Sequence, residues 1–103
     1  MDGAIREYQT ALTINPNHVP ARTNLGFALY QKGDLDGAIG EYRAALKISP
    51  NYIEAYNNLG IALFKKGDLD GAIREFQEVL KIDPNYTDAI YNLGVVMGRK
   101  RQG

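Results

Sequence analysis

Apolar residues recur along the chain at intervals of three and four positions, which is the period of a helix with one apolar face. Between Ile53 and Lys66 the residues at this spacing are Ala55, Leu59, Ala62 and Leu63. The next stretch, up to Ile82, has the same period in Ala72, Ile73, Phe76, Val79, Leu80 and Ile82. No segment alternates apolar and polar residues over any length, so the pattern predicts helices and no strands.

Glycine, aspartate and proline mark where these two helices begin and end. The first helix is expected to stop at Gly67, because glycine accepts the left-handed backbone found after many helix ends. Asp68 suits the N-cap of the second helix, and Asp70 is favourable in its first turn. The second helix ends before Pro84, since the residue preceding a proline is pushed out of the helical conformation. We name the first helix of such a pair helix A and the second helix B.

The sequence is built from a repeat of 34 residues. Residues 19–52 and 53–86 align over their whole length with 21 identical positions. The same period continues outward, so residues 1–18 are a half repeat with helix B, and residues 87–103 are a half repeat with helix A, which is expected to run from Ala89 to about Arg99. The prediction is a single array over residues 1–103, with six helices in the order B-A-B-A-B-A. A fixed period of this length is typical of a solenoid, and the out-of-phase ends suggest a segment of a longer protein.

Particular residue types occupy fixed positions of the unit, counted from Val19, Ile53 and Thr87 as position 1. In the middle unit these are Tyr56, Leu59, Gly60, Leu63, Ala72, Phe76, Val79 and Pro84, and in the preceding unit Arg22, Leu25, Gly26, Leu29, Ala38, Tyr42, Ala45 and Pro50. This pattern resembles the tetratricopeptide repeat (TPR), a helix–turn–helix unit, and it covers nearly the whole chain. Arg22 stands where the family has an aromatic residue, and Val79 where it has alanine. The resemblance implies an all-α, right-handed solenoid.

Glycine recurs inside helix A at Gly26, Gly60 and Gly94, although it lowers helix stability by up to about 1 kcal/mol. The recurrence predicts a close approach of helix B, with Ala38 and Ala72 as its small partners. Tyr42 and Phe76 are expected to fill the space between units.

The composition narrows the class of function. Twelve basic and twelve acidic side chains give no net charge, which argues against a dedicated nucleic-acid binder and against a polybasic membrane anchor. No apolar run approaches the length of a membrane span. The chain has no cysteine, one serine and one histidine, so we expect no enzyme activity and no cofactor. The cellular compartment stays open, with the cytoplasm favoured.

Four aspartates and one histidine are candidate metal ligands by residue type. Asp34, Asp36, Asp68 and Asp70 resemble part of a calcium loop, but each pair leads directly into a helix, so we assign them to helix capping and predict no metal site. His18 is interpreted as a loop side chain that packs across a turn.

The resemblance places the binding surface of the family on helix A. Positions 2, 5, 6, 9, 12 and 13 of each TPR unit line a concave groove and form one helical stripe. The candidate groove residues at these positions are Thr23, Asn24, Phe27, Tyr30, Asn57, Asn58, Ile61, Phe64, Lys65, Tyr91, Asn92 and Val95.

Two patterns stand out in this candidate groove. Asn24, Asn58 and Asn92 form a ladder similar to that of the TPR superhelix of O-linked N-acetylglucosamine transferase, and an amide side chain can pair with a peptide backbone in either direction. The alternative is that asparagine at this position serves packing or solvation. The apolar and aromatic groove residues favour a partner site; the alternative is that a neighbouring chain or segment covers them.

Some TPR proteins hold a C-terminal carboxylate in a clamp of lysine, arginine and asparagine. The corresponding positions here are Thr23, Phe27, Asn58, Asp88 and Asn92, of which only Asn58 matches. We therefore expect no carboxylate clamp.

Three hypotheses of function follow. The first is a non-catalytic module that binds an extended peptide or a partner helix in the groove. The second is a structural repeat segment that stacks end to end, and the third is an accessory substrate-binding arm of a larger enzyme. For self-association as a homo-oligomer, the residues expected on the uncovered faces of the end helices are Ile5, Tyr8, Leu12, Leu93, Val96 and Met97.

Overall fold

The computed structural model describes residues 2–102, which form six α-helices and no strand. The helices are α1 (Asp2–Ile14), α2 (Val19–Lys32), α3 (Leu35–Ile48), α4 (Ile53–Lys66), α5 (Leu69–Ile82) and α6 (Thr87–Gln102). The predicted order B-A-B-A-B-A is confirmed, with α1, α3 and α5 as B helices and α2, α4 and α6 as A helices.

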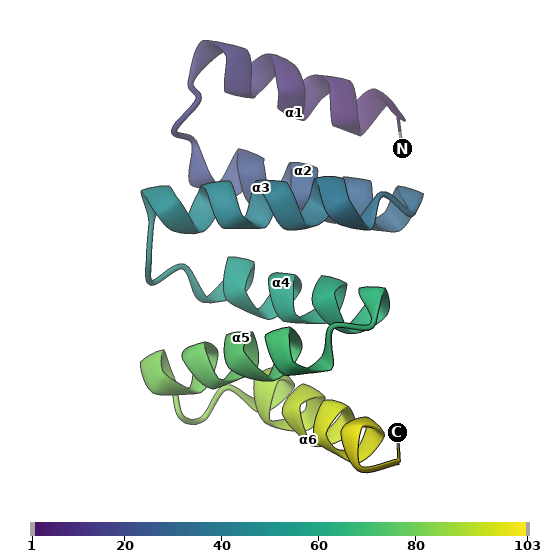
Figure 1. Ribbon diagram of the computed structural model, residues 1–103. Coiled ribbons are helices and arrows are strands. Elements are labelled where there is room, and N and C mark those ends of the chain that lie inside the picture. The colour runs from purple at the N-terminus through teal and green to yellow at the C-terminus, as the bar shows by residue number, and fades with distance from the viewer. Residues whose placement is uncertain (1, 103) are drawn as a thin grey trace.

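The helices stack in chain order, so that α1 and α6 form the two ends of an elongated solenoid with extents of 44 × 27 × 18 Å (Figure 1). Each helix contacts its neighbours in sequence. The A helices also contact one another in succession, α2 with α4 and α4 with α6, whereas within residues 2–102 the B helices make no such contacts. The A helices therefore form the inner, more tightly curved layer.

The predicted helix ends are confirmed at both internal A-to-B turns. Gly33 and Gly67 have a φ of 96°, and their N–H groups donate to the carbonyls of the last helical turn. Asp34 and Asp68 then cap the B helices, each accepting a hydrogen bond of 2.9 Å from the backbone N–H three residues later. Glycine and aspartate together reverse the chain within two residues, which places helix B against its own helix A.

The last A helix differs from the other two. The position of Gly33 and Gly67 is occupied in α6 by Arg101, which favours the right-handed conformation. Helix α6 therefore continues to Gln102, beyond the end near Arg99 that the sequence pattern predicts.

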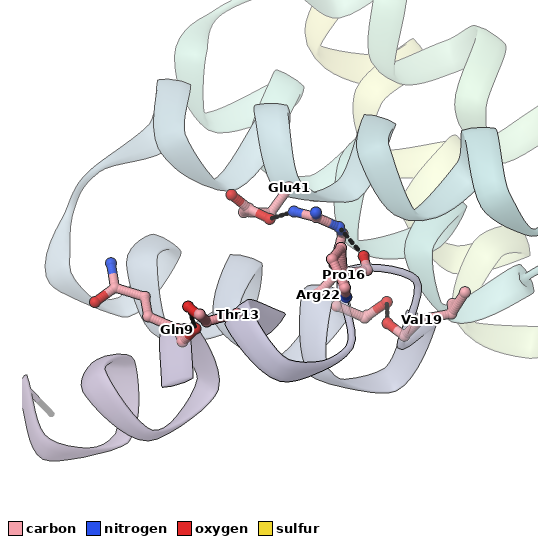
Figure 2. Close-up of polar contacts among 7 residues, drawn as sticks. Gln9, Thr13, Pro16, Val19, Arg22 and Glu41 are labelled. Atoms are coloured by element: carbon pink, nitrogen blue, oxygen red, sulfur yellow. Dashed lines mark hydrogen bonds and ion pairs between the residues drawn. The ribbon is translucent and has the colours of Figure 1, made fainter. Parts of the chain in front are cut away.

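Polar groups join the first turn of α2 to its surroundings. His18 lies in the loop before α2 and is its N-cap, because its Nδ1 accepts a hydrogen bond of 3.0 Å from Ala21 N–H. Arg22 donates to the Pro16 carbonyl at 3.1 Å and pairs with Glu41 at 2.9 Å (Figure 2). Arg22 therefore replaces the family's aromatic residue with an ion pair between helices A and B of one repeat.

The glycines of helix A are needed because aromatic rings lie against them. A Cβ built on Gly26 would meet the Tyr42 ring at 2.5 Å, and one on Gly60 would meet the Phe76 ring at 2.6 Å. The prediction of a close approach is confirmed for these two repeats, and the nearest atoms of helix B belong to the ring. Both rings are 1% exposed, and they anchor helix B to the middle of helix A.

Candidate functional site

The inner layer of A helices carries most of the predicted groove residues at its surface. Asn24, Phe27, Lys65, Tyr91 and Val95 are exposed. The others on this face are half-buried, namely Tyr30, Asn58, Ile61, Phe64 and Asn92.

Two predicted groove residues are corrected by their burial. Thr23 is 1% exposed and its hydroxyl donates to the Val19 carbonyl at 3.0 Å, whereas Asn57 is 7% exposed. The buried Asn57 Oδ1 has no hydrogen-bond partner among the described residues. Both occupy position 5 of their units, where a short side chain stays inside the helix packing. Tyr91, at the same position of α6, is long enough to emerge and is 72% exposed.

Two hollows lie on this face, and they are the same hollow repeated with the period of the sequence. The first is lined by Phe27, Tyr30, Tyr42, Asn58 and Ile61. The second is lined by Ile61, Phe64, Phe76, Tyr91, Asn92, Val95 and Val96. Five lining positions of the first recur 34 residues later in the second. Each hollow therefore has one asparagine of the ladder and one ring from helix B, Tyr42 or Phe76.

The two hollows differ in the space they offer. The first has a volume of about 20 Å³, because the Phe27 and Tyr30 rings stack on each other with centroids 6.4 Å apart. The second has about 220 Å³, with the smaller Ile61 in the position of Phe27 and Val95 in the position of Ile61. Only the second hollow has room for a large apolar side chain.

The side-chain amides of the asparagine ladder are unpaired among the described residues. The side chains of Asn24, Asn58 and Asn92 make no hydrogen bond with any described residue. Asn58 and Asn92 each line a hollow, but Asn24 lines neither. The sequence placed three asparagines on one stripe, and the structure gives two of them an apolar neighbourhood.

Charged side chains of opposite sign lie at the two ends of this face. Lys65 and Arg99, near the C-termini of α4 and α6, are exposed, and the Arg99 guanidinium lies 5.4 Å from the centroid of the Phe64 ring. Glu54 and Asp88, in the first turns of α4 and α6, are exposed at the other end of the same helices. The inner face therefore has positive charge at one end and negative charge at the other.

Tyr42 is a groove residue that the sequence analysis assigned only to packing. Burial raises the pKa of its hydroxyl, and the nearby charge of Glu54 raises it further, so the group remains a hydrogen-bond donor at neutral pH. The hydroxyl makes no hydrogen bond within residues 2–102. The signal in the sequence was the shared position of Tyr42 and Phe76, which lies on helix B rather than on the helix A stripe.

The residues expected at the two end faces are partly corrected. Ile5 and Leu12 are buried at 8% exposure against Ala21, Leu25 and Ala28, and Val96 is buried at 1% in the main core. Tyr8 and Leu93 are half-buried, and Met97 is 49% exposed, so these three remain available. Ile90, 50% exposed, belongs to the α6 face and was not anticipated.

An all-α solenoid with a groove along one layer of helices defines a repeat protein of the helix–turn–helix class. The family profile described as "TPR repeat" matches residues 1–33, 28–67 and 62–100, so the chain belongs to the TPR family. Membership assigns the chain to a family of protein–protein interaction modules.

Solved structures agree with this fold. A crystal structure of MamA superposes with a TM-score of 0.90 at 32% identity, covering 96% of this chain and 58% of the MamA chain. The first TPR of Spaghetti (RPAP3), bound to the HSP90 peptide SRMEEVD, superposes with a TM-score of 0.94 at 24% identity, covering 97% of this chain and 79% of that one. This chain thus spans less than two thirds of MamA.

No curated protein matches the sequence significantly. Among residues 2–102, none of the helices has the length and apolar character needed to cross a membrane.

Proposed function

We propose that the inner face of the solenoid binds an extended peptide whose apolar side chain occupies the second hollow. The observation that carries this proposal is the repeated hollow with an unpaired asparagine at its edge. The apolar hollow of about 220 Å³ is smaller than the roughly 300–1,000 Å³ of a small-molecule site, so we infer that it takes a single side chain. Phe64, Tyr91 and Val95 contribute rigid apolar surface to it.

The amides of Asn58 and Asn92 hold the peptide backbone in this proposal. Each amide offers one acceptor and two donors, so it pairs with the N–H and C=O of an extended chain without fixing its sequence. The two residues lie one repeat apart at equivalent positions, which suits a chain that runs along the stack of A helices. The Tyr42 hydroxyl supplies a further donor beside Asn58.

The charges beside the hollow add a preference for acidic residues. Arg99 lies against Phe64, which lines the hollow, and Lys65 follows Phe64 in the same helix. We expect the preferred peptides to carry an aspartate or glutamate next to the apolar anchor, in an attraction that salt weakens.

In this proposal the groove does not recognise the C-terminal carboxylate of the peptide. The RPAP3 domain is bound to a peptide that ends in Glu-Val-Asp. Three of the clamp positions are occupied here by buried Thr23, apolar Phe27 and acidic Asp88, which do not bind a carboxylate. A peptide and its C-terminally amidated form are therefore expected to bind this chain equally well.

The test is a selection from a library of capped decapeptides, followed by calorimetry of the selected sequences. Val95→Trp, which fills the second hollow, is expected to weaken binding about tenfold or more. Ile14→Trp, at a residue 81% exposed on α1 and outside the groove, is the matched control and should leave affinity unchanged. Equal affinity for Val95→Trp and the unmodified chain, or a consensus without an apolar anchor, would overturn the proposal.

A further inference from the structure

We propose that the 103-residue chain assembles head to tail, with α1 of one copy packed on α6 of the next and the Tyr8 ring seated over Gly94. The occupant of the open α6 face is thus a second copy of the same chain. This interaction forms between the end faces of two copies and does not require a bound peptide.

The contact is one that the chain already makes twice within itself. The Tyr42 ring lies over Gly26, and the Phe76 ring lies over Gly60, in each case with helix B against its own helix A. Gly94 is the third glycine of this series, and a Cβ built on it meets nothing within 4 Å. Tyr8 is the aromatic residue of α1 at the position of Tyr42 and Phe76. Within residues 2–102 the series therefore has one ring without a glycine and one glycine without a ring.

The α6 side of this junction is an open apolar hollow. Its lining residues are Ile73, Gly94, Met97, Lys100 and Arg101, and its volume is about 680 Å³. Met97 and Ile90 are each about half exposed on this helix. The equivalent positions face a B helix in the two complete repeats, so a B helix is the element that fits this space.

On the α1 side, the residues that would face a preceding A helix are more exposed than their equivalents in α3. Ala38, Tyr42 and Ala45 of α3 are 0–1% exposed between the two A helices that flank them. Their equivalents in α1 are Ala4 and Tyr8, which are half-buried, and Ala11, which is exposed. The adjacent face of α1 holds Ile5 and Leu12 against α2, and the half-buried Tyr8 packs against this cluster, so docking of the open face leaves the packing of α1 on α2 in place.

This geometry is heterologous, because one end of the molecule contacts the other end of the next. A dimer still has one open α1 face at one end and one open α6 face at the other. Association therefore continues beyond the dimer unless the superhelix closes. The junction also brings Tyr8 and Asn24 of one copy beside Val95 of the other, the same set of repeat positions that lines the two hollows. Asn24, which lines no hollow in the single chain, thereby gains the position held by Asn58 and Asn92.

The experiment blocks one end at a time. Tyr8→Glu removes the ring and leaves the α6 face intact, whereas Gly94→Leu fills the α6 face and leaves α1 intact. Sedimentation velocity of the unmodified chain is expected to show concentration-dependent species larger than a dimer, and each variant alone should be monomeric. An equimolar mixture of the two variants should form a 1:1 dimer, since it contains one intact copy of each face.

The controls separate this contact from misfolding and from other surfaces. Gly40→Leu, at an exposed glycine of α3 with nothing within 4 Å, should assemble as the unmodified chain does. Far-ultraviolet circular dichroism should show equal helicity for all variants. A monomeric unmodified chain at high concentration, assembly that survives either substitution, or a variant mixture that remains monomeric would each overturn the proposal. None of these measurements involves a peptide, so the proposed groove function stands or fails separately.

Discussion

Arg22 Nη1 lies 2.9 Å from Glu41 Oε1, and this ion pair joins helices α2 and α3 of one repeat. In the next repeat the equivalent positions hold Tyr56 and Glu75, and Glu75 makes no ion pair within residues 2–102. Burial raises the pKa of Glu75; the charge of Arg43 opposes the shift and that of Glu78 adds to it. The Glu41 carboxylate thus has an ion-pair partner in Arg22, whereas the equivalent Glu75 carboxylate has none among the described residues.

Glu75→Gln is expected to stabilise the protein at neutral pH, because it removes a charge that the folded state disfavours. A carboxyl group with a raised folded pKa contributes its full stability below its unfolded value of 4.5 and loses that contribution as the pH rises through the folded pKa. The melting temperatures of the variant and the unmodified chain should therefore coincide below pH 4 and separate at pH 7. A gap that is constant from pH 3.5 to pH 7 would contradict the assignment.

Glu41→Gln is the matched change in the other repeat and should have the opposite sign. It removes the charge that pairs with Arg22, at a site where both side chains are about three-quarters buried. We expect a loss of up to about 1 kcal/mol at pH 7, measured by urea unfolding.

Gly60→Leu should destabilise the middle repeat although leucine is the better helix former. Its Cβ would lie 2.6 Å from the buried Phe76 ring, and overpacking of this kind costs roughly 1–3 kcal/mol. Gly94→Leu provides the control, because nothing lies within 4 Å of that Cβ. In dilute solution the Gly94 variant should unfold at an equal or higher temperature, and equal effects at the two sites would show that the ring does not determine the outcome.

Gly71→Ala tests a glycine whose role is to make room for a cap. The Asp68 carboxylate that accepts from Gly71 N–H occupies the space of a Cβ, with its Cγ at 2.8 Å from the built atom. The gain of about 1 kcal/mol that alanine brings in an open helix should be offset by the loss of a cap of similar size. Gly40→Ala, in open space on α3, should show the full gain in thermal unfolding. A full gain at Gly71 would mean that Asp68 keeps its cap.

The fold was predictable because local and repeating signals agree along this chain. Gly67 and Asp68 fix the turn, the apolar period fixes the helix, and the repeat extends both to the other units. The end of α6 was misplaced by three residues because Arg101 replaces the glycine that ends the other A helices.

The sequence predicts which helix face holds the candidate site, but it does not predict which side chains of that face are buried. A helical stripe names every residue of one face, and it does not distinguish Thr23, which stays inside the packing, from Tyr91, which emerges from it. Ile5 and Leu12 were misassigned for a related reason: a B helix packs on two A helices, and the periodicity of α1 alone does not say which face meets which. The larger volume of the second hollow goes with Ile61 in the position of Phe27 and Val95 in the position of Ile61, whereas Phe64 keeps an aromatic ring in the position of Tyr30.

The asparagine ladder either binds the peptide backbone or serves packing and solvation. Substitutions separate these two roles, because Asn24, Asn58 and Asn92 differ in surroundings. Asn58→Ala and Asn92→Ala should each weaken binding of a selected peptide by about two- to tenfold, the effect of losing one or two hydrogen bonds. Asn24→Ala should have no effect in the monomeric Gly94→Leu chain, where Asn24 lines neither hollow. Titration calorimetry measures the affinities, and urea unfolding measures stability, which should be unchanged because these amides bond to no described residue. Loss of stability without loss of affinity would assign the asparagines to packing, whereas loss of affinity at all three positions would mean that the peptide extends past the first hollow.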